Sequence, residues 1–83
     1  MTKKFNNICD LIKILNDDMR MTQKEIGDYV GVEAYIVSLW KSGKIYANSN
    51  NYDKVHDMVL RLNGRNIKYP GQALDILTLE DEV

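Results

Sequence analysis

The sequence of 83 residues has one cysteine, one histidine and no long apolar run, and each shortage excludes a class of protein. Cys9 has no partner for a disulfide or a thiolate metal cluster. His56 has no Cys, His or carboxylate partner at ligand spacing, and no catalytic Ser/His/Asp or Cys/His set can be assembled. No apolar stretch reaches the ~20 residues of a membrane span, and no signal peptide is recognisable. We therefore expect a soluble, cytoplasmic protein that is not an enzyme and needs no cofactor.

An excess of charge of one sign is also missing. The chain carries 11 Lys and Arg against 12 Asp and Glu, a formal net charge of −1, whereas DNA-binding domains usually have a basic excess. Three of the acidic residues are Glu80, Asp81 and Glu82, so residues 1–79 hold 11 basic residues against 9 acidic ones. We expect a faintly basic globular part and a frayed acidic tail at residues 80–83, which is a weak electrostatic signature of nucleic-acid binding.

Apolar residues recur every three to four positions over most of the chain, which predicts an all-α fold. A small helical bundle of four to five helices is expected, with helices at about 5–16, 23–30, 33–42 and 51–62. The first of these has an apolar stripe through Phe5, Ile8, Cys9, Ile12 and Leu15. Asn63-Gly64 is a strong stop signal after the fourth, so the chain divides into a domain over residues 1–64 and an extension over residues 65–83.

The segment 22–44 predicts two short helices joined by a tight turn. Thr22 and Glu25 have the spacing of a capping box at the start of the first helix. Gly31 can adopt the left-handed conformation that ends this helix without steric cost, and Trp40 is expected on the inner face of the second. Two helices with such a short connection cross steeply, as in the DNA-binding helix-turn-helix.

The same segment resembles the Cro- and lambda-repressor-like helix-turn-helix family, also called the XRE family. The residues that match the family pattern in register are Thr22, Gln23, Ile26, Gly27, Gly31, Val32, Val37, Ser38, Trp40, Gly43 and Lys44. Gly27 stands where the family requires a small residue, because the second motif helix crosses there. The resemblance implies a small transcriptional regulator, of the type found in phages and mobile elements, that binds operator DNA as a homodimer.

In this family the outward residues of the second motif helix read base edges, and the loop that follows lies along the DNA backbone. The resemblance therefore implies contacts with double-stranded DNA by Gln23, Glu33, Ala34, Tyr35, Ser38, Leu39, Lys44, Tyr46, Asn48 and Ser49. A plain polar loop accounts equally well for the composition of residues 44–50. Ser49 or Asn50 is expected to cap the fourth helix.

Several residues depart from the family pattern. The groove-facing positions offer mainly Ala, Tyr and Leu, including an outward-pointing Leu39, instead of the bidentate donors that discriminate bases. Such side chains can touch thymine methyl groups, so a preference for A·T pairs is possible. Glu33 would bring a carboxylate towards phosphates unless it caps the helix or accepts from a cytosine amino group. The family's Arg–Glu pair between the first and third helices is replaced by Asn16 and Lys41, which leaves packing alone, or Lys41 with Asp17, to join these helices.

The extension at residues 65–83 allows two interpretations. Tyr69-Pro70-Gly71 predicts a turn, and it is followed either by a helix at about 72–79, which we favour, or by the second strand of a short hairpin. In Cro-like proteins this region commonly makes the dimer contact. The resemblance therefore implies dimerisation through Ile67, Tyr69, Leu74, Ile76 and Leu77.

The function predicted from the sequence is sequence-specific DNA binding by a transcriptional regulator. The missing basic excess and the apolar residues Ala34, Tyr35 and Leu39 favour an alternative of a different class. In that alternative, the helix-turn-helix fold serves as a protein-interaction module, such as an anti-repressor or inhibitor.

Overall fold

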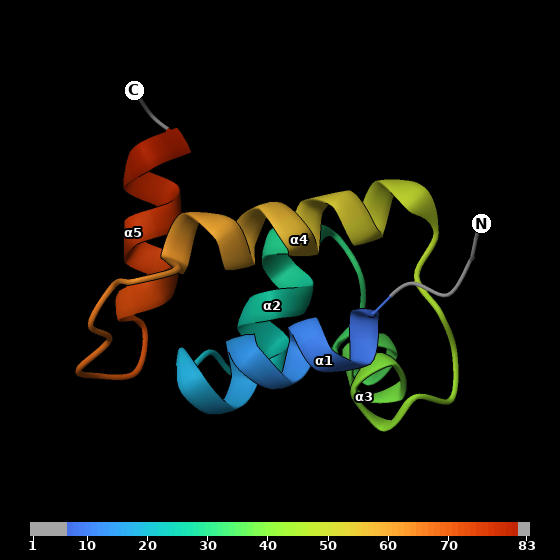
Figure 1. Cartoon of the computed structure of the whole chain (residues 1–83). Coiled ribbons are helices and arrows are strands. Elements are labelled where there is room, and N and C mark those ends of the chain that lie inside the picture. Colours follow the sequence, from blue (N-terminus) through green and yellow to red (C-terminus); the bar gives the residue numbers. More distant parts are fainter. Residues whose placement is uncertain (1–6, 82–83) are drawn as a thin grey trace.

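The computed structural model describes residues 7–81, and this part of the chain forms a bundle of helices without a strand (Figure 1). The all-α fold predicted from the apolar spacing is confirmed. The α-helices are α1 (Ile8–Lys13), α2 (Gln23–Val30), α3 (Ala34–Ser42), α4 (Ser49–Leu62) and α5 (Gln72–Asp81). Within residues 7–81, no helix is long and apolar enough to cross a membrane.

The first helix extends further along the chain than predicted. α1 continues into a π-helical turn, Ile14–Asp18, in which the amide of Met19 donates to the carbonyl of Ile14 at 3.0 Å. The connection expected from residue 17 therefore begins at Met19, and Arg20 follows in the left-handed conformation with a φ of 59°. The predicted start of this helix at Phe5 lies outside the described residues.

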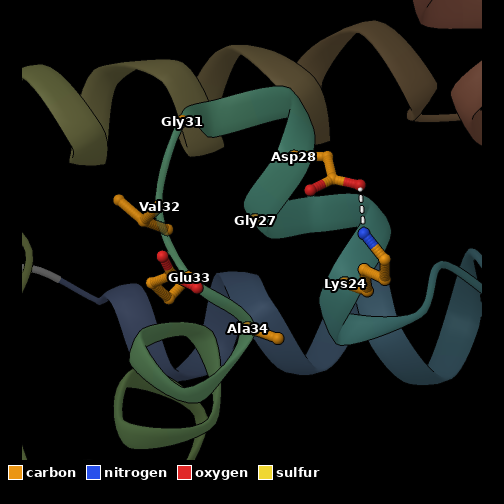
Figure 2. Close-up of a pocket in the computed structure, with 7 residues that line it drawn as sticks. All are labelled: Lys24, Gly27, Asp28, Gly31, Val32, Glu33 and Ala34. Atoms are coloured by element: carbon orange, nitrogen blue, oxygen red, sulfur yellow. Dashed lines mark hydrogen bonds and ion pairs between the residues drawn. The ribbon is translucent and has the colours of Figure 1, made fainter.

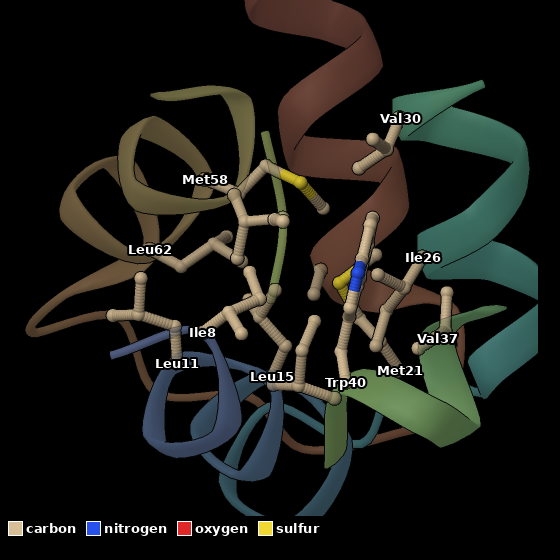
Figure 3. Close-up of a cluster of buried hydrophobic side chains, with 14 of the residues drawn as sticks. Ile8, Leu11, Leu15, Met21, Ile26, Val30, Val37, Trp40, Met58 and Leu62 are labelled. Atoms are coloured by element: carbon tan, nitrogen blue, oxygen red, sulfur yellow. The ribbon is translucent and has the colours of Figure 1, made fainter. Parts of the chain in front are cut away.

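Trp40 of α3 lies at the centre of the hydrophobic core and is only 1% exposed, as the helical spacing predicts. Figure 3 shows its indole among Met21, Ile26 and Val37. The core takes side chains from all five helices and from the connections between them: Ile8, Leu11, Ile12, Leu15, Met21, Ile26, Val30, Val37, Trp40, Ala47, Val55, Met58, Leu62, Ala73 and Leu77. Because α3 turns Val37 and Trp40 into this core, its opposite side is not covered by the other helices.

The extension after α4 folds as a helix and not as a hairpin. The turn predicted at residues 69–71 leads directly into α5: the amide of Gln72 donates to the carbonyl of Tyr69 at 3.2 Å. In return, the side-chain oxygen of Gln72 accepts from the amide of Lys68 at 2.6 Å. These bonds hold the start of α5 against the end of the loop.

α5 contributes to the core of the chain itself. Ala73 and Leu77, four residues apart on one helical face, are fully buried, and α5 contacts α4. The helix continues to Asp81, so residues 80 and 81 are ordered in a helix and not frayed as expected. Glu82 and Val83 lie outside the described residues.

Candidate nucleic-acid interface

α2 begins with the capping box predicted from Thr22 and Glu25. The Thr22 hydroxyl accepts from the amide of Glu25 at 3.0 Å, and the Glu25 carboxylate accepts from the amide of Thr22 at 2.9 Å. Gln23 is the first helical residue and is half-buried. Because the Glu25 carboxylate already lies at the positive end of the helix dipole, a phosphate contact by Gln23 would have to come from its side-chain amide.

Two glycines set the turn between α2 and α3. Gly31 has a φ of 101°, the left-handed conformation that glycine adopts most easily. The amides of Gly31 and Val32 both donate to the carbonyl of Gly27, at 2.7 and 2.9 Å. A Cβ atom on Gly27 would lie 2.6 Å from the carbonyl oxygen of Val32. The need for a small residue at position 27 therefore comes from the closeness of this backbone oxygen in the turn.

A shallow hollow of about 540 Å³ lies beside this turn (Figure 2). Its charges are mixed: Lys24 forms an exposed ion pair with Asp28 at 3.1 Å, and Glu33 is exposed nearby. Glu33 occupies the position before α3 but makes no side-chain hydrogen bond to cap it, so the capping role considered for this carboxylate is not adopted. The hollow is lined by Lys24, Gly27, Asp28, Gly31, Val32, Glu33 and Ala34.

The outer face of α3 consists of small, hydroxyl and apolar side chains. Tyr35 is 65% exposed, and Ser38 is exposed three residues later. Ala34 and Leu39 flank them and are half-buried. Leu39 therefore lies at the edge of this face, partly covered, and does not point straight into solvent as expected. Ala34, Tyr35, Ser38 and Leu39 are called the α3 outer face below.

The sequence analysis missed Ser42 on this side of α3. It is exposed and follows Ser38 and Tyr35 at helical spacing, so the periodicity would have been enough to identify it. Its hydroxyl donates to the carbonyl of Leu39 at 3.1 Å, which ties it to its own helix. Two further surface residues near α3 were not predicted as DNA contacts. Lys24 lines the same hollow as Ala34, and Ile45 is exposed in the loop after α3.

Lys41, the one cation within α3, points away from this face. Its ammonium group donates to the side-chain oxygen of Asn16 at 2.6 Å and forms an ion pair with Asp17 at 3.2 Å. The thiol of Cys9 also donates to the Lys41 carbonyl at 3.1 Å. Lys41 thus joins α3 to the first helix in place of the family's Arg–Glu pair, one of the two possibilities considered, and it adds no positive charge to the outer face.

The loop between α3 and α4 holds the remaining predicted contacts. Lys44 and Ser49 are exposed, and Tyr46 is 61% exposed. Asn48 is the residue that caps α4, because its side-chain oxygen accepts from the amide of Asn51 at 2.9 Å. Ser49 is the first residue of α4 instead of its cap. Of the contacts predicted here, Lys44, Tyr46 and Ser49 are therefore exposed at the surface and do not cap a helix.

The residues predicted for dimerisation fall into three groups. Leu77 lies fully inside the core of its own chain. Ile67, Leu74 and Ile76 are half-buried and pack against that core. Tyr69 is 54% exposed, together with Leu79, which is 65% exposed and was not singled out from the sequence. Both line a hollow of about 390 Å³ with Gln72, Asp75, Ile76 and Thr78.

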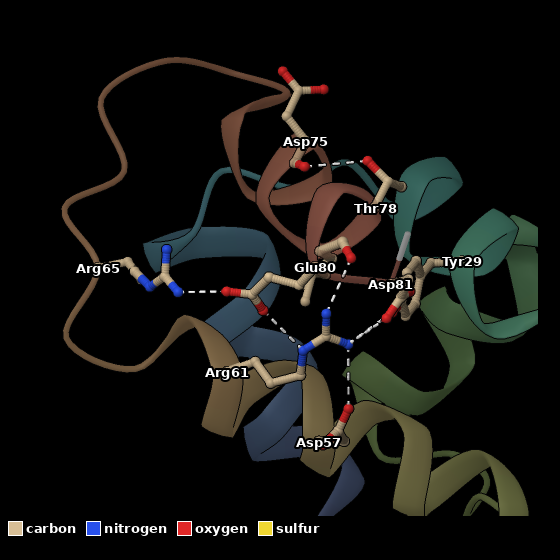
Figure 4. Close-up of polar contacts among 9 residues, drawn as sticks. Tyr29, Asp57, Arg61, Arg65, Asp75, Thr78, Glu80 and Asp81 are labelled. Carbon is tan, nitrogen blue, oxygen red and sulfur yellow. Dashed lines mark hydrogen bonds and ion pairs between the residues drawn. The ribbon is translucent and has the colours of Figure 1, made fainter. Parts of the chain in front are cut away.

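Much of the positive charge near the C-terminus is engaged within the molecule. Figure 4 shows Arg61 of α4 between carboxylates of α4 and α5. Arg61 contacts Asp57 at 3.4 Å, Glu80 at 3.1 Å and Asp81 at 3.0 Å, and donates to the carbonyl of Leu77 at 3.0 Å. The carboxylates of Glu80 and Asp81 are therefore paired with arginines of their own chain instead of forming a separate negative tail.

Tyr29 joins this cluster from α2. Its hydroxyl donates to Asp81 and accepts from Arg61 at 3.0 Å. Burial, and then the hydrogen bond to Asp81, raise the pKa of Tyr29 above its ordinary value of 10. Burial lowers the pKa of Arg61, but the hydrogen bonds with Tyr29 and Glu80 outweigh this and raise it, so both groups hold their protons across the physiological range.

Charge at the helix-turn-helix itself is balanced. Residues 22–44 contain three basic residues, Lys24, Lys41 and Lys44, against three acidic ones, Glu25, Asp28 and Glu33.

In the described part of the chain, His, Cys, Asp and Glu side chains form no group of three suited to a metal ion. Comparison with known proteins adds no relative, since no family model, no curated protein and no solved structure matches the chain.

Proposed function

We propose that the chain is a sequence-specific DNA-binding transcriptional regulator that inserts α3 into the major groove of operator DNA. The observation that carries the proposal is the α2–α3 unit, in which the Gly27 and Gly31 contacts fix a short turn and leave one face of α3 outside the core. A major groove about 12 Å wide accommodates an α-helix. A regulator of this kind acts in the cytoplasm, on the operators of a phage or mobile element.

Phosphate contacts in this arrangement come from both sides of α3. Gln23 lies at the start of α2, Lys44 and Tyr46 lie in the loop after α3, and Ser49 is the first residue of α4. Side chains of these types commonly bind phosphate oxygens and set the register of a protein on the duplex. Because Lys41 is engaged with Asn16 and Asp17, it is not counted among them.

The balanced charge predicts a weak dependence of binding on salt. Log affinity falls by about 0.9 per phosphate neutralised for each unit of log salt. Lys24 is paired with Asp28 and Lys41 with Asp17, so Lys44 is the cation of residues 22–44 left for phosphate, which corresponds to a slope of about −1 per protomer. Proteins with extensive basic surfaces have much steeper slopes.

The experiment is an electrophoretic mobility-shift titration with the DNA that flanks the gene, in the presence of competitor DNA and at several salt concentrations. Lys44→Ala should weaken binding to all sequences and flatten the slope by about one unit. Lys68→Ala is the matched control, because it removes the same charge from the loop at the opposite end of the molecule from α3 (Figure 1). Absence of specific duplex binding at low salt by folded protein would contradict the proposal.

A second candidate function is favoured by the equal numbers of acidic and basic residues in residues 22–44 and by the exposure of Tyr35, Ile45 and Tyr46. In that case α3 and its loop form the contact surface for a protein, and the chain acts as an anti-repressor or inhibitor. Tyr35→Ala would then remove most of the partner affinity, because aromatic anchors dominate protein interfaces. Binding would depend little on salt, and the titration above would find no operator.

A further inference from the structure

We infer that the α3 outer face recognises thymine methyl groups, so that the operator half-site read by this protein is rich in A·T pairs and is read mainly through apolar contact. This inference rests on the proposed DNA-binding function and specifies the bases that the same surface selects. It is carried by the chemistry of the side chains on α3 and by the direction of Lys41.

The first step is the absence of guanine-reading groups from α3. Guanine is usually recognised by Arg or Lys, which donate to its O6 and N7 atoms, and adenine by the paired donor and acceptor of Asn or Gln. The nine residues of α3, Ala34–Ser42, include no Arg, Asn or Gln. Lys41 donates to Asn16 and pairs with Asp17 on the first helix. No bidentate donor of α3 therefore faces the groove.

The second step is what the face does present. Tyr35 is exposed and stands four residues before Leu39, while Ala34 stands four residues before Ser38, so these side chains form two neighbouring pairs on one helical side. In the major groove, thymine is the base that displays an apolar group, its C5 methyl. Ala34, Leu39 and the ring of Tyr35 match this methyl in chemistry, and the Ser38 hydroxyl can donate to thymine O4 or accept from adenine N6.

The third step concerns the acidic groups around the face. Glu33 and Asp28 lie in the hollow beside the start of α3 (Figure 2). Asp28 is paired with Lys24, whereas Glu33 makes no cap. A carboxylate can accept from a cytosine amino group, so Glu33 allows a C·G pair at the edge of the half-site. The centre of the face, at Tyr35 and Ser38, carries no charge.

The test begins with selection of tight-binding duplexes from a random pool, followed by replacement of thymine with uracil in the selected site. Uracil keeps the hydrogen-bonding edge and lacks only the methyl group. We expect an A·T-rich half-site and a roughly fourfold loss of affinity for each contacted methyl, as for the loss of one buried carbon from an apolar contact. Uracil at A·T pairs outside the selected half-site is the control, and it should leave affinity unchanged.

A protein variant separates this inference from an effect on DNA shape. Tyr35→Ala and Leu39→Ala should bind thymine and uracil sites with nearly equal affinity, whereas Lys44→Ala should bind both more weakly and keep the thymine-to-uracil ratio of the parent. Specific, salt-dependent binding with a G·C-rich site, or with no uracil effect, would overturn the inference and leave the proposed function standing. Selection of no site at all by folded protein would overturn both.

Discussion

An added methyl group at position 27 would meet a backbone carbonyl oxygen, not a side chain that can move aside. Helix propensity alone makes Gly27→Ala favourable by about 1 kcal/mol, whereas overpacking costs about 1–3 kcal/mol. The oxygen of Val32 belongs to a turn held by two hydrogen bonds to Gly27, so the cost should prevail. We expect Gly27→Ala to lower the free energy of unfolding by up to about 2 kcal/mol in urea denaturation.

The matched control for this substitution is Asp28→Ala, at the exposed neighbouring position of the same helix. It should change the free energy of unfolding by less than about 0.5 kcal/mol. A Gly27→Ala variant more stable than the parent would mean that α2 and the turn lie further apart than described.

At the level of single residues, features that depend on sequence neighbours could be predicted, and features that depend on long-range contacts could not. The capping box of Thr22 and Glu25 and the left-handed Gly31 depend on neighbours in the sequence, so the bounds 23–30 of α2 were predicted correctly. The partners of Lys41 could be narrowed down only because the family pattern placed its counterpart near Asn16. The partial burial of Leu39 depends on the packing around α3, which helical spacing does not determine.

α5 is the element whose attachment the structure explains best. It is held to α4 by the buried residues Ala73 and Leu77 and by Arg61, whose side chain is 21% exposed. Removing this guanidinium would take from Asp81 its arginine partner and leave Glu80 with Arg65 alone. We expect Arg61→Met to cost about 2 kcal/mol, the scale of hydrogen bonds to charged groups, and to increase hydrogen exchange of the α5 amides more than that of α2.

Arg65 provides the control for the Arg61 experiment. It pairs with Glu80 alone and is 46% exposed, so Arg65→Met should cost less than about 1 kcal/mol, as is usual for exposed ion pairs. Equal effects of the two substitutions would show that the cluster adds nothing beyond ordinary surface pairing.

For the helices, too, features set by local sequence were predictable and features set by long-range contacts were not. Helix spacing was sufficient for the existence of the first four helices, and it favoured the fifth over a hairpin without deciding between them. It did not indicate the π-helical turn Ile14–Asp18, because that turn depends on the fit of the first helix to the rest of the bundle. The ordered end of α5 was missed because Arg61 and Asp81 are twenty residues apart. Leu77 was interpreted as a contact to a partner, since the sequence alone does not show how many apolar residues the core can hold.

For the whole molecule, we propose that a second copy of the chain covers the exposed side of α5. Tyr69 and Leu79 flank the hollow of about 390 Å³, and two-fold pairing of DNA-binding domains places two recognition helices in successive major grooves. Leu79→Glu should shift the sedimentation of the protein at micromolar concentration from dimer to monomer, because it places a charge in an apolar contact.

Leu60→Glu is the matched control, since Leu60 is 60% exposed on α4. It should leave the sedimentation of the dimer unchanged. If Leu60→Glu alone produced a monomer, the dimer surface would lie on α4, and a parent protein that sediments as a monomer would contradict the pairing altogether.

The attachment of α5 also has a consequence for synthesis on the ribosome. Helices form within about a microsecond, so α4 can fold as soon as it leaves the exit tunnel. The carboxylates of Glu80 and Asp81 are made about twenty residues after Arg61, which corresponds to about 1–4 s at 5–20 residues per second. Until α5 has also left the tunnel, Arg61 has only Asp57 of its own helix as an acidic partner, and the core lacks Ala73 and Leu77. The core of this domain therefore closes only when its last helix is free of the ribosome, and until then other hydrophobic chains can bind to its open side.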